Sequence, residues 1–413
     1  MKLIICLFLA SFNFLIGTTR QVTIGADLFF SKEYAPLLNQ KKIGLITNQT
    51  AINADMESTI TLLKRNAKTY HYTITALFAP EHGITGASHA SEQILDEKDE
   101  DNIPIYSLHG KTRRMTKEML KNVNLLVYDI QDIGSRSYTY IATLFYSMEE
   151  AAKLGIDVVV LDRPNPINGV VIDGPMLDDP LRSIVGYINV PYCHGMTIGE
   201  LSLFFNAEYK IGCKLHVVKM KGWNRKMSFP DTGLPWIPTS PNIPEATTPL
   251  YYPMTGLIGE LQIVNIGIGY TLPFKVIGAP WINAKKFTQK LNEQKFPGVY
   301  FEPFYYKPFY GRFKNEECEG ALIIVKDPLT YKPVSTQYLM IGILKALYPD
   351  NFSAAINASK DRREMFTKVN GSPEIYKIIT ELTNIVWKLR SFQEKERADF
   401  KEYRKKYLIP DYS

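Results

Sequence analysis

Cysteine is scarce in this 413-residue sequence, and that scarcity excludes a fold built on cross-links. The four cysteines are Cys6, Cys193, Cys213 and Cys318, and no two of them form a Cys-x-x-Cys pair. Because Cys6 lies in an N-terminal apolar run, the other three allow one disulfide at most. A disulfide scaffold is therefore excluded, and the missing Cys-x-x-Cys spacing argues against structural zinc.

Several motifs of common enzyme classes are also absent. No Gly-x-Gly-x-x-Gly follows an expected strand, and no complete Gly-x-x-x-x-Gly-Lys-Ser/Thr phosphate loop is present. The His-Glu-x-x-His of zinc proteases and the Gly-x-Ser-x-Gly of serine esterases are missing. The 48 Lys and Arg residues form no long basic block, so no nucleic-acid partner is indicated. Carboxylates remain the natural catalytic groups, and we expect no cofactor.

The N-terminus has the pattern of a secretory signal. Lys2 precedes a mostly apolar run over residues 3–16, and Gly17, Thr18 and Thr19 follow it. A short basic start, a brief apolar stretch and small residues predict a signal peptide over residues 1–18. A retained anchor helix is the alternative, although the run is shorter than the ~20 residues of a membrane span. We expect an exported protein, periplasmic or secreted, with no membrane span after signal removal.

Short apolar runs then alternate with helix-like stretches along the first half of the chain. The apolar runs, each a candidate strand, cover residues 42–47, 73–78, 103–108, 125–130, 157–161 and 214–220. Continuous Val, Ile and Leu runs are typical of strands buried on both faces of a parallel sheet. Strand–helix alternation favours a doubly wound layer. The sequence therefore predicts an α/β fold with a Rossmann-like, doubly wound parallel sheet.

The composition of the sequence changes after Trp223. Pro and Gly punctuate residues 230–280, and an α+β pattern follows, with a long helix expected over residues 374–402. We therefore predict a Rossmann-like N-terminal domain over residues 19–223 and a smaller α+β C-terminal domain over residues 224–413.

Polar clusters follow four of the expected strands. In an open parallel sheet, ligands bind beyond the carboxyl ends of the strands, so these clusters should meet in one crevice. We expect the substrate to contact side chains from them and from two later segments, namely Asn48, Gln49, His82, His109, Arg136, Tyr138, Asp162, Arg163, Asn165, His194 and Asn242.

Three carboxylates are candidates for catalysis. Glycoside hydrolysis commonly needs one carboxylic acid to protonate the leaving oxygen and a second group at the anomeric centre or on water. Glu81, in a Pro-Glu-His-Gly turn, is the first choice for the acid, with Asp132 or Glu260 assisting. Each has a structural alternative: Glu81 as a helix cap or an ion-pair partner, Asp132 as a turn residue or N-cap, and Glu260 as a satisfied structural acid.

The cationic side chains near the strand ends suggest two further possibilities. Arg136 and Arg163 could capture a carboxylate through bidentate hydrogen bonds, although most arginines near acids are salt-bridge partners. A metal site built from His82, His89 and His109 is conceivable, but no ligand spacing supports it, and none is predicted.

At these segments the sequence resembles the NamZ/YbbC family of exo-acting β-N-acetylmuramidases. The similar stretches run in order over residues 40–325, and include Leu77-Phe-Ala-Pro-Glu-His-Gly83, Asp129-Ile-Gln-Asp-Ile-Gly-Ser-Arg136, Leu161-Asp-Arg-Pro-Asn-Pro166, His194-Gly-Met-Thr-Ile-Gly-Glu200 and Ser240-Pro-Asn-Ile-Pro244. The resemblance implies a Rossmann-like domain without a nucleotide, a smaller second domain and a cleft between them. It further implies release of N-acetylmuramic acid from the non-reducing end of peptidoglycan fragments, with Glu81 as the acid and Glu260 as the second-domain carboxylate.

One segment departs from the family pattern. Around Glu260 the family usually reads Glu-Gly-Thr-Asn-x-Ser-x-Gly-Arg-Gly-Thr, whereas this chain has Ile263, Ile268 and Tyr270 in place of the Asn, the Arg and the final Thr. Two other functions therefore stay open: a non-catalytic binder of wall sugars, and a metal-dependent amidase or deacetylase acting on the same polymer.

Overall fold

The computed structural model describes residues 22–88 and 95–413. The expected signal peptide over residues 1–18 and the candidate ligand His89 lie outside the described residues. In the described part of the chain, no helix is both long and apolar enough to cross a bilayer.

The first domain is built around a seven-stranded sheet with the order β3-β4-β2-β1-β5-β6-β7. Its strands are β1 Lys42–Thr47, β2 Thr73–Ala79, β3 Glu97–Lys98, β4 Pro104–Ser107, β5 Leu125–Asp129, β6 Asp157–Leu161 and β7 Leu215–Val218. The short β3 is antiparallel to β4, and the other neighbours are parallel. This confirms the doubly wound α/β fold that the alternating sequence predicts.

The chain leaves β1 in two directions, which fixes where a ligand can bind. It moves outward from β1 to β2 and β4, then returns to the other side of β1 to form β5, β6 and β7. The strand order therefore reverses between β1 and β5, where Thr47 is paired with Asp129. In doubly wound sheets, the crevice at this reversal is the ligand-binding position.

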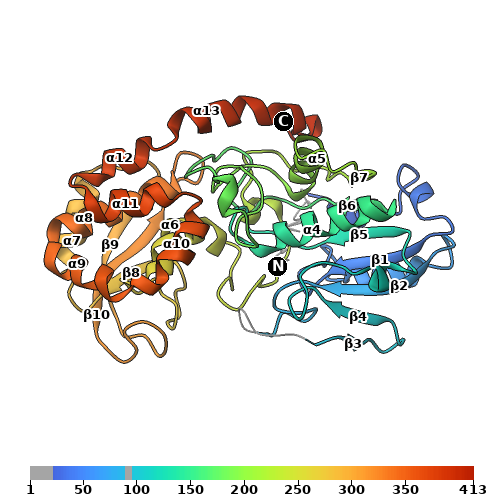
Figure 1. The fold of residues 1–413 in the computed structure, drawn as a ribbon, viewed down its shortest axis with the longest axis horizontal. Coiled ribbons are helices and arrows are strands. Elements are labelled where there is room, and N and C mark those ends of the chain that lie inside the picture. Colours follow the sequence, from blue (N-terminus) through green and yellow to red (C-terminus); the bar gives the residue numbers. More distant parts are fainter. Residues whose placement is uncertain (1–21, 89–94) are drawn as a thin grey trace, which may run out of the picture.

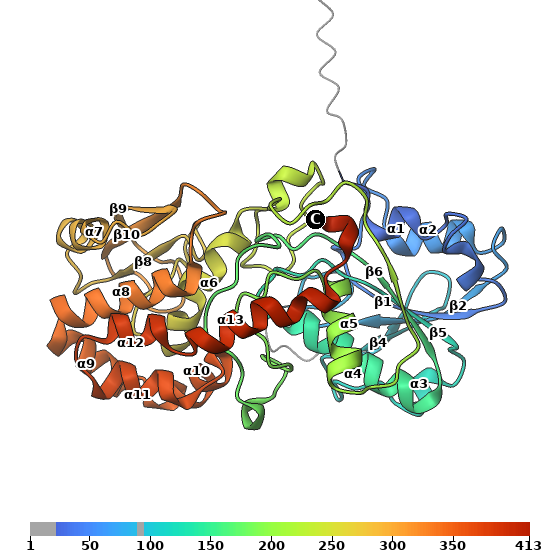
Figure 2. The ribbon, with the colours of Figure 1, turned by 90° about the horizontal axis from the view of Figure 1, so that it is seen from above.

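Helices cover both faces of the sheet (Figures 1 and 2). They are α1 Gly25–Leu28, α2 Thr59–Asn66, α3 Lys117–Leu120, α4 Thr139–Leu154 and α5 Ile198–Glu208. Alternate strand residues enter separate cores: Leu45 packs with Leu63 of α2, whereas Ile46 belongs to the cluster containing Phe145 of α4. Burial on both faces explains the continuous apolar runs in the sequence. Helix α4 ends at Gly155, in the left-handed conformation (φ 64°) that glycine adopts without strain.

The second domain packs helices on a three-stranded antiparallel sheet of order β8-β10-β9. Its elements are α6 Thr248–Leu261, β8 Val276–Ala279, α7 Ala284–Glu293, β9 Val299–Tyr306, β10 Cys318–Val325, α8 Pro333–Leu347, α9 Pro349–Ala358, α10 Arg363–Asn370, α11 Pro373–Glu381, α12 Ile385–Ser391 and α13 Glu394–Tyr403. One apolar cluster contains residues of α4, α6 and α8, so the two domains share a core.

The C-terminal helix differs from the expectation. Instead of one helix over residues 374–402, the chain forms α11, α12 and α13. The breaks coincide with Asn384 and Gln393, whose positive φ values of 52° and 53° are incompatible with a continuing right-handed helix. These breaks let α13 cross from the second domain back to the first (Figures 1 and 2).

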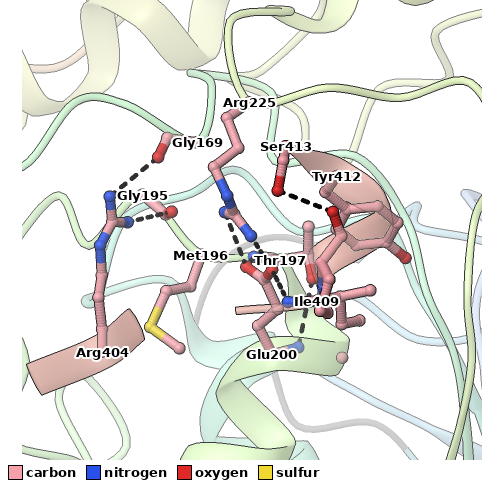
Figure 3. A network of polar contacts seen from close by, with 12 residues as sticks. Gly169, Gly195, Met196, Thr197, Glu200, Arg225, Arg404, Ile409, Tyr412 and Ser413 are labelled. Atoms are coloured by element: carbon pink, nitrogen blue, oxygen red, sulfur yellow. Dashed lines mark hydrogen bonds and ion pairs between the residues drawn. The ribbon is translucent and has the colours of Figure 1, made fainter. Parts of the chain in front are cut away.

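The end of the chain is fastened to the first domain by buried polar contacts (Figure 3). Arg404 donates hydrogen bonds to the carbonyl oxygens of Gly169, His194 and Gly195. Glu200 on α5 accepts from the Ile409 backbone N–H at 2.8 Å and is ion-paired with Arg225. The last residues therefore belong structurally to the first domain, a connection that a single sequence boundary near Trp223 does not describe.

Candidate active site

The loops after β1 and β5 meet at the point where the strand order reverses. Thr50, after β1, accepts a hydrogen bond from the Gln131 N–H, after β5, at 3.0 Å. Asn48 Oδ1 accepts from the Thr50 N–H and hydroxyl at 3.0 and 2.6 Å. The segments that the sequence predicted to converge are therefore joined directly.

Buried polar atoms without partners concentrate at this junction. Within the described residues, several side-chain atoms here are buried and accept or donate no hydrogen bond, namely Thr47 Oγ1, Asn48 Nδ2, Gln49 Oε1, Gln131 Oε1 and Asp132 Oδ1. Buried polar groups in folded proteins are nearly always paired. A cluster of unpaired buried polar groups, at the point where the strand order reverses, is typical of a binding site for a polar ligand.

Glu81 lies beside this junction, in the turn after β2. Its side chain is only 12% exposed, and Oε2 accepts a 2.7 Å hydrogen bond from the Thr139 hydroxyl at the start of α4. His109 Nε2, in the loop after β4, lies 3.5 Å from Glu81 Oε1. The turn is tight because His82 and Gly83 both have positive φ, at 71° and 78°. Glu81 is thus held by two other elements in a nearly enclosed position.

The two histidines beside Glu81 have different surroundings. Burial lowers the pKa of His109; the Glu81 carboxylate opposes that effect, and the positive charge of Arg113 adds to it. His109 is therefore neutral at neutral pH. His82 has a backbone partner instead, because its Nδ1 is 2.8 Å from the Ser88 carbonyl oxygen.

Asp132 has an unusual environment for a carboxylate. It is 7% exposed, Oδ2 accepts from the Gly134 N–H at 2.7 Å, and Oδ1 has no hydrogen-bond partner within the described residues. Burial raises the pKa of Asp132 to about 7. Hydrogen bonds from the backbone N–H groups of Gly134 and Ile133 lower the pKa but offset only part of this rise. A carboxyl group that holds its proton near neutral pH, next to a binding junction, is suited to proton transfer or to donating a hydrogen bond.

The second domain contributes Glu260 and Tyr252 from α6. Burial raises the pKa of Glu260, while Arg362 opposes the rise. The Tyr252 hydroxyl is 3.2 Å from Ser137 Oγ in the first domain. Burial raises the Tyr252 pKa to about 12, and the negative charges of Glu260 and Glu81 contribute to the rise. Tyr252 is therefore within electrostatic range of a carboxylate from each domain.

The Pro-rich segment after the first domain closes over the strand ends. Tyr138 donates to Thr239 Oγ1 at 2.8 Å, and Tyr140 donates to the Thr239 carbonyl oxygen at 2.5 Å. Gln49 Nε2 donates to the Pro238 carbonyl oxygen at 2.9 Å. Asn242, half-buried, lies a few residues further along the same segment. Tyr138 and Gln49 thus lie at the junction, as expected, but both anchor this segment.

Arg136 does not have the environment of a substrate-binding residue, which corrects one expectation. Its guanidinium is 2% exposed and donates to the carbonyl oxygens of Pro175 and Val190 in the first domain and of Val369 and Asn370 in the second. Each of these bonds uses a donor that a carboxylate ligand would need. Arg136 joins the two domains.

Arg163 and Asp162 also have structural partners instead of facing a ligand. Arg163 forms a bidentate pair with Asp129, with Nη2 2.9 Å from Oδ2, and donates to the Ile52 carbonyl oxygen. Asp162 accepts from the Thr197 and Tyr412 hydroxyls at 2.8 and 2.7 Å. Both side chains therefore fasten the ends of β5 and β6 to neighbouring segments.

Asn165 and His194 are buried for similar reasons. Asn165 donates to the Met196 carbonyl oxygen at 2.9 Å and accepts from the Ile167 N–H at 3.0 Å. His194 is fully buried, and its Nδ1 accepts from the Met196 N–H at 3.2 Å. Burial lowers the His194 pKa to about 3, so this ring is neutral, and its Nε2 has no hydrogen-bond partner within the described residues.

Sequence reasoning missed residues that complete the site. Thr139 donates a hydrogen bond to Glu81, and burial together with the charge of Glu81 raises the pKa of Tyr140 and Tyr252, yet nothing in their spacing marks these residues individually. The available signal was the polar and aromatic run over residues 135–140, directly after the β5 loop. Among the described residues, no group of three His, Cys, Asp or Glu side chains is arranged to hold a metal ion.

Comparison with known proteins covers nearly the whole chain. Residues 43–247 match the family described as exo-beta-N-acetylmuramidase NamZ, N-terminal, and residues 250–409 match its C-terminal counterpart. The division between these matches lies further along the chain than the boundary predicted near Trp223. The peptidoglycan beta-N-acetylmuramidase NamZ of Bacillus subtilis (strain 168) is 41% identical over 392 residues, covering 94% of this chain and 91% of that protein.

Two crystal structures of DUF1343 family proteins from Bacteroides fragilis NCTC 9343 have the same fold. The first is 40% identical, with a TM-score of 0.87 over 94% of this chain and 99% of its own. The second is 27% identical, with a TM-score of 0.70 over 94% and 98% of the two chains.

Proposed function

The chain belongs to the NamZ family of exo-β-N-acetylmuramidases, and on this basis we propose that it removes N-acetylmuramic acid from the non-reducing end of peptidoglycan fragments. Family membership makes it a glycoside hydrolase. The observation that carries the finer proposal is the position of Glu81, a nearly enclosed carboxyl group in the turn after β2, beside the loops that hold a cluster of unpaired polar atoms.

We assign the general acid to Glu81. The Thr139 hydroxyl donates a hydrogen bond to Oε2 of Glu81. His109 lies beside Oε1 as a neutral ring, which does not compete as a cation. In the reaction, Glu81 would give its proton to the glycosidic oxygen as the bond to the anomeric carbon breaks.

The second group in the reaction has three candidates. Asp132 and Glu260 both have a pKa raised by burial, and either could act on water or on the anomeric centre. The acetamido group of the substrate could itself be the nucleophile, in which case one protein acid is sufficient for the chemistry.

Replacing Glu81 tests the proposal directly. We expect Glu81→Gln to lower kcat/KM on a chromogenic β-N-acetylmuramide by about 10²–10⁴-fold, because the amide cannot donate the proton. The melting temperature should stay close to that of the wild type, since the amide preserves the contact with Thr139. Glu118→Gln, at an exposed position on α3, is the matched control.

Two results would contradict this assignment. Near-normal turnover by Glu81→Gln would remove Glu81 from the mechanism. Binding of muropeptides by the wild type, measured by calorimetry, without any product in mass spectrometry would instead favour a non-catalytic sugar-binding protein.

We also propose that the protein acts outside the cytoplasm, in the periplasm or after secretion. The basic and apolar pattern of residues 2–16 supports this, as does the location of a peptidoglycan substrate. Fractionation of cells that express the full chain tests it, and accumulation of an uncleaved chain in the cytoplasm would contradict it.

A further inference from the structure

Within the described residues, three arginines around the strand ends have their Nη groups engaged by protein partners and do not offer them to an anionic substrate group. Arg136 is surrounded by carbonyl oxygens, Arg163 is paired with Asp129, and Arg225 is paired with Glu200. N-acetylmuramic acid carries a lactyl carboxylate, so an enzyme that selects it over a neutral amino sugar needs a cation or other strong donor elsewhere in the cleft.

A cationic cavity lies next to the His109–Glu81 pair. The loop after β4 and one side chain of α4 line a shallow cavity of about 520 Å³, with Gly110, Lys111, Thr112, Arg113, Arg114 and Tyr146. No acidic side chain is among these lining residues. Gly110-Lys111-Thr112 is not a phosphate loop, because Ile105 stands where that motif has its first glycine.

The three cations of this cavity are not equivalent. Arg114 forms ion pairs with Glu149 and Glu150, and its guanidinium lies 4.4 Å from the centroid of the Tyr146 ring. These contacts fix the loop to α4. Lys111 and Arg113 are exposed, and neither is paired with an acid in the part of the chain that the structure describes.

The loop that carries Arg113 also carries His109 of the catalytic pair. Gly110, which lines the cavity, directly follows His109, whose Nε2 lies 3.5 Å from Glu81 Oε1. The positive charge of Arg113 contributes to the lowered pKa of His109. The cavity and the catalytic pair are therefore built on one short loop.

We propose that this cavity is an anion subsite in which Arg113, assisted by Lys111, binds the lactyl carboxylate of the muramic acid whose glycosidic bond faces Glu81. The inference rests on the proposed function and adds the residue that selects the sugar. Arg113 is a binding residue, whereas Arg114 only positions the loop. Guanidinium groups suit this task because two parallel N–H groups match a carboxylate.

Two chromogenic substrates, one with and one without the lactyl group, distinguish a loss of carboxylate recognition from a general loss of activity. We expect Arg113→Ala to lower kcat/KM on 4-nitrophenyl β-N-acetylmuramide by about 10- to 100-fold, mainly through KM, because a charge-assisted hydrogen bond is lost. Weak turnover of the corresponding N-acetylglucosaminide, which lacks the lactyl group, should stay the same. Arg113→Lys should recover part of the activity. Lys117→Ala, an exposed position outside the cavity, is the control for lost positive charge.

A second measurement needs no variant. N-acetylmuramic acid should inhibit the wild type competitively at least 10-fold better than its methyl ester, and added salt should reduce the difference. Equal inhibition by acid and ester, or equal losses of Arg113→Ala on both chromogenic substrates, would overturn the subsite. A wild type that hydrolyses neither substrate would overturn the proposed function itself, so the two failures are distinguishable.

Discussion

Replacing Asp132 by Asn is expected to stabilise the protein at alkaline pH and to leave acid stability nearly unchanged. The Asp132 carboxyl is buried, its Oδ1 has no partner among the described residues, and its pKa is raised from 3.8 to about 7. An acid with a raised folded-state pKa holds its proton more tightly in the folded than in the unfolded chain. Its favourable contribution is fully present below the unfolded pKa and is lost as pH rises through about 4 to 7.

The size of the effect follows from these two pKa values. With about 1.4 kcal/mol for each unit of pKa, the raised pKa of Asp132 lowers the free energy of unfolding by roughly 4 kcal/mol at pH 8 and by less than about 2 kcal/mol at pH 5. Asn does not titrate, and its amide oxygen can still accept from the Gly134 N–H. The free energy of unfolding of the variant relative to wild type should therefore rise by about 2–3 kcal/mol from pH 5 to pH 8.

Thermal unfolding at a series of pH values measures this difference. At about 2–4 °C for each kcal/mol, the variant should gain roughly 5–10 °C on the wild type between pH 5 and pH 8. Asp162, whose pKa is also raised to about 7, titrates in both proteins and cancels. Asp350→Asn, at an exposed position on α9, controls for the lost carboxylate. A difference that does not change with pH would refute the reasoning.

Two further predictions concern the C-terminal segment and metals. Arg404→Met should destabilise the protein by about 3–5 kcal/mol in denaturant titrations, because the carbonyl oxygens of Gly169, His194 and Gly195 lose their donor. Lys405→Met, at a neighbouring exposed position, should be nearly neutral. Similar denaturation midpoints for both variants would contradict this role of Arg404. Hydrolysis should persist in full after treatment with a chelator and desalting, since the proposed chemistry uses carboxyl groups, and an activity restored only by added metal would revive the amidase or deacetylase alternative.

Much of the first domain could be predicted from local patterns. The strands over residues 42–47 and 157–161 have the bounds that their apolar runs indicate, because strands buried on both faces need apolar side chains at every position. The meeting of the loops after β1 and β5 could be predicted as well, since the carboxyl ends of parallel strands meet at one edge. The break of the C-terminal helix at Asn384 and Gln393 could not, because the helix-like pattern continues through both residues and only their positive φ values reveal it.

By itself, the sequence determined the order of strands and helices, the family resemblance and the set of polar loops at the sheet edge. Only the tertiary structure decided which of those polar side chains are available. Arg136 looks suited to a carboxylate in the sequence, but its Nη2 donates to carbonyl oxygens as distant along the chain as those of Val369 and Asn370. The residue type determines the chemistry of a side chain, whereas its partners depend on which distant segments pack against it.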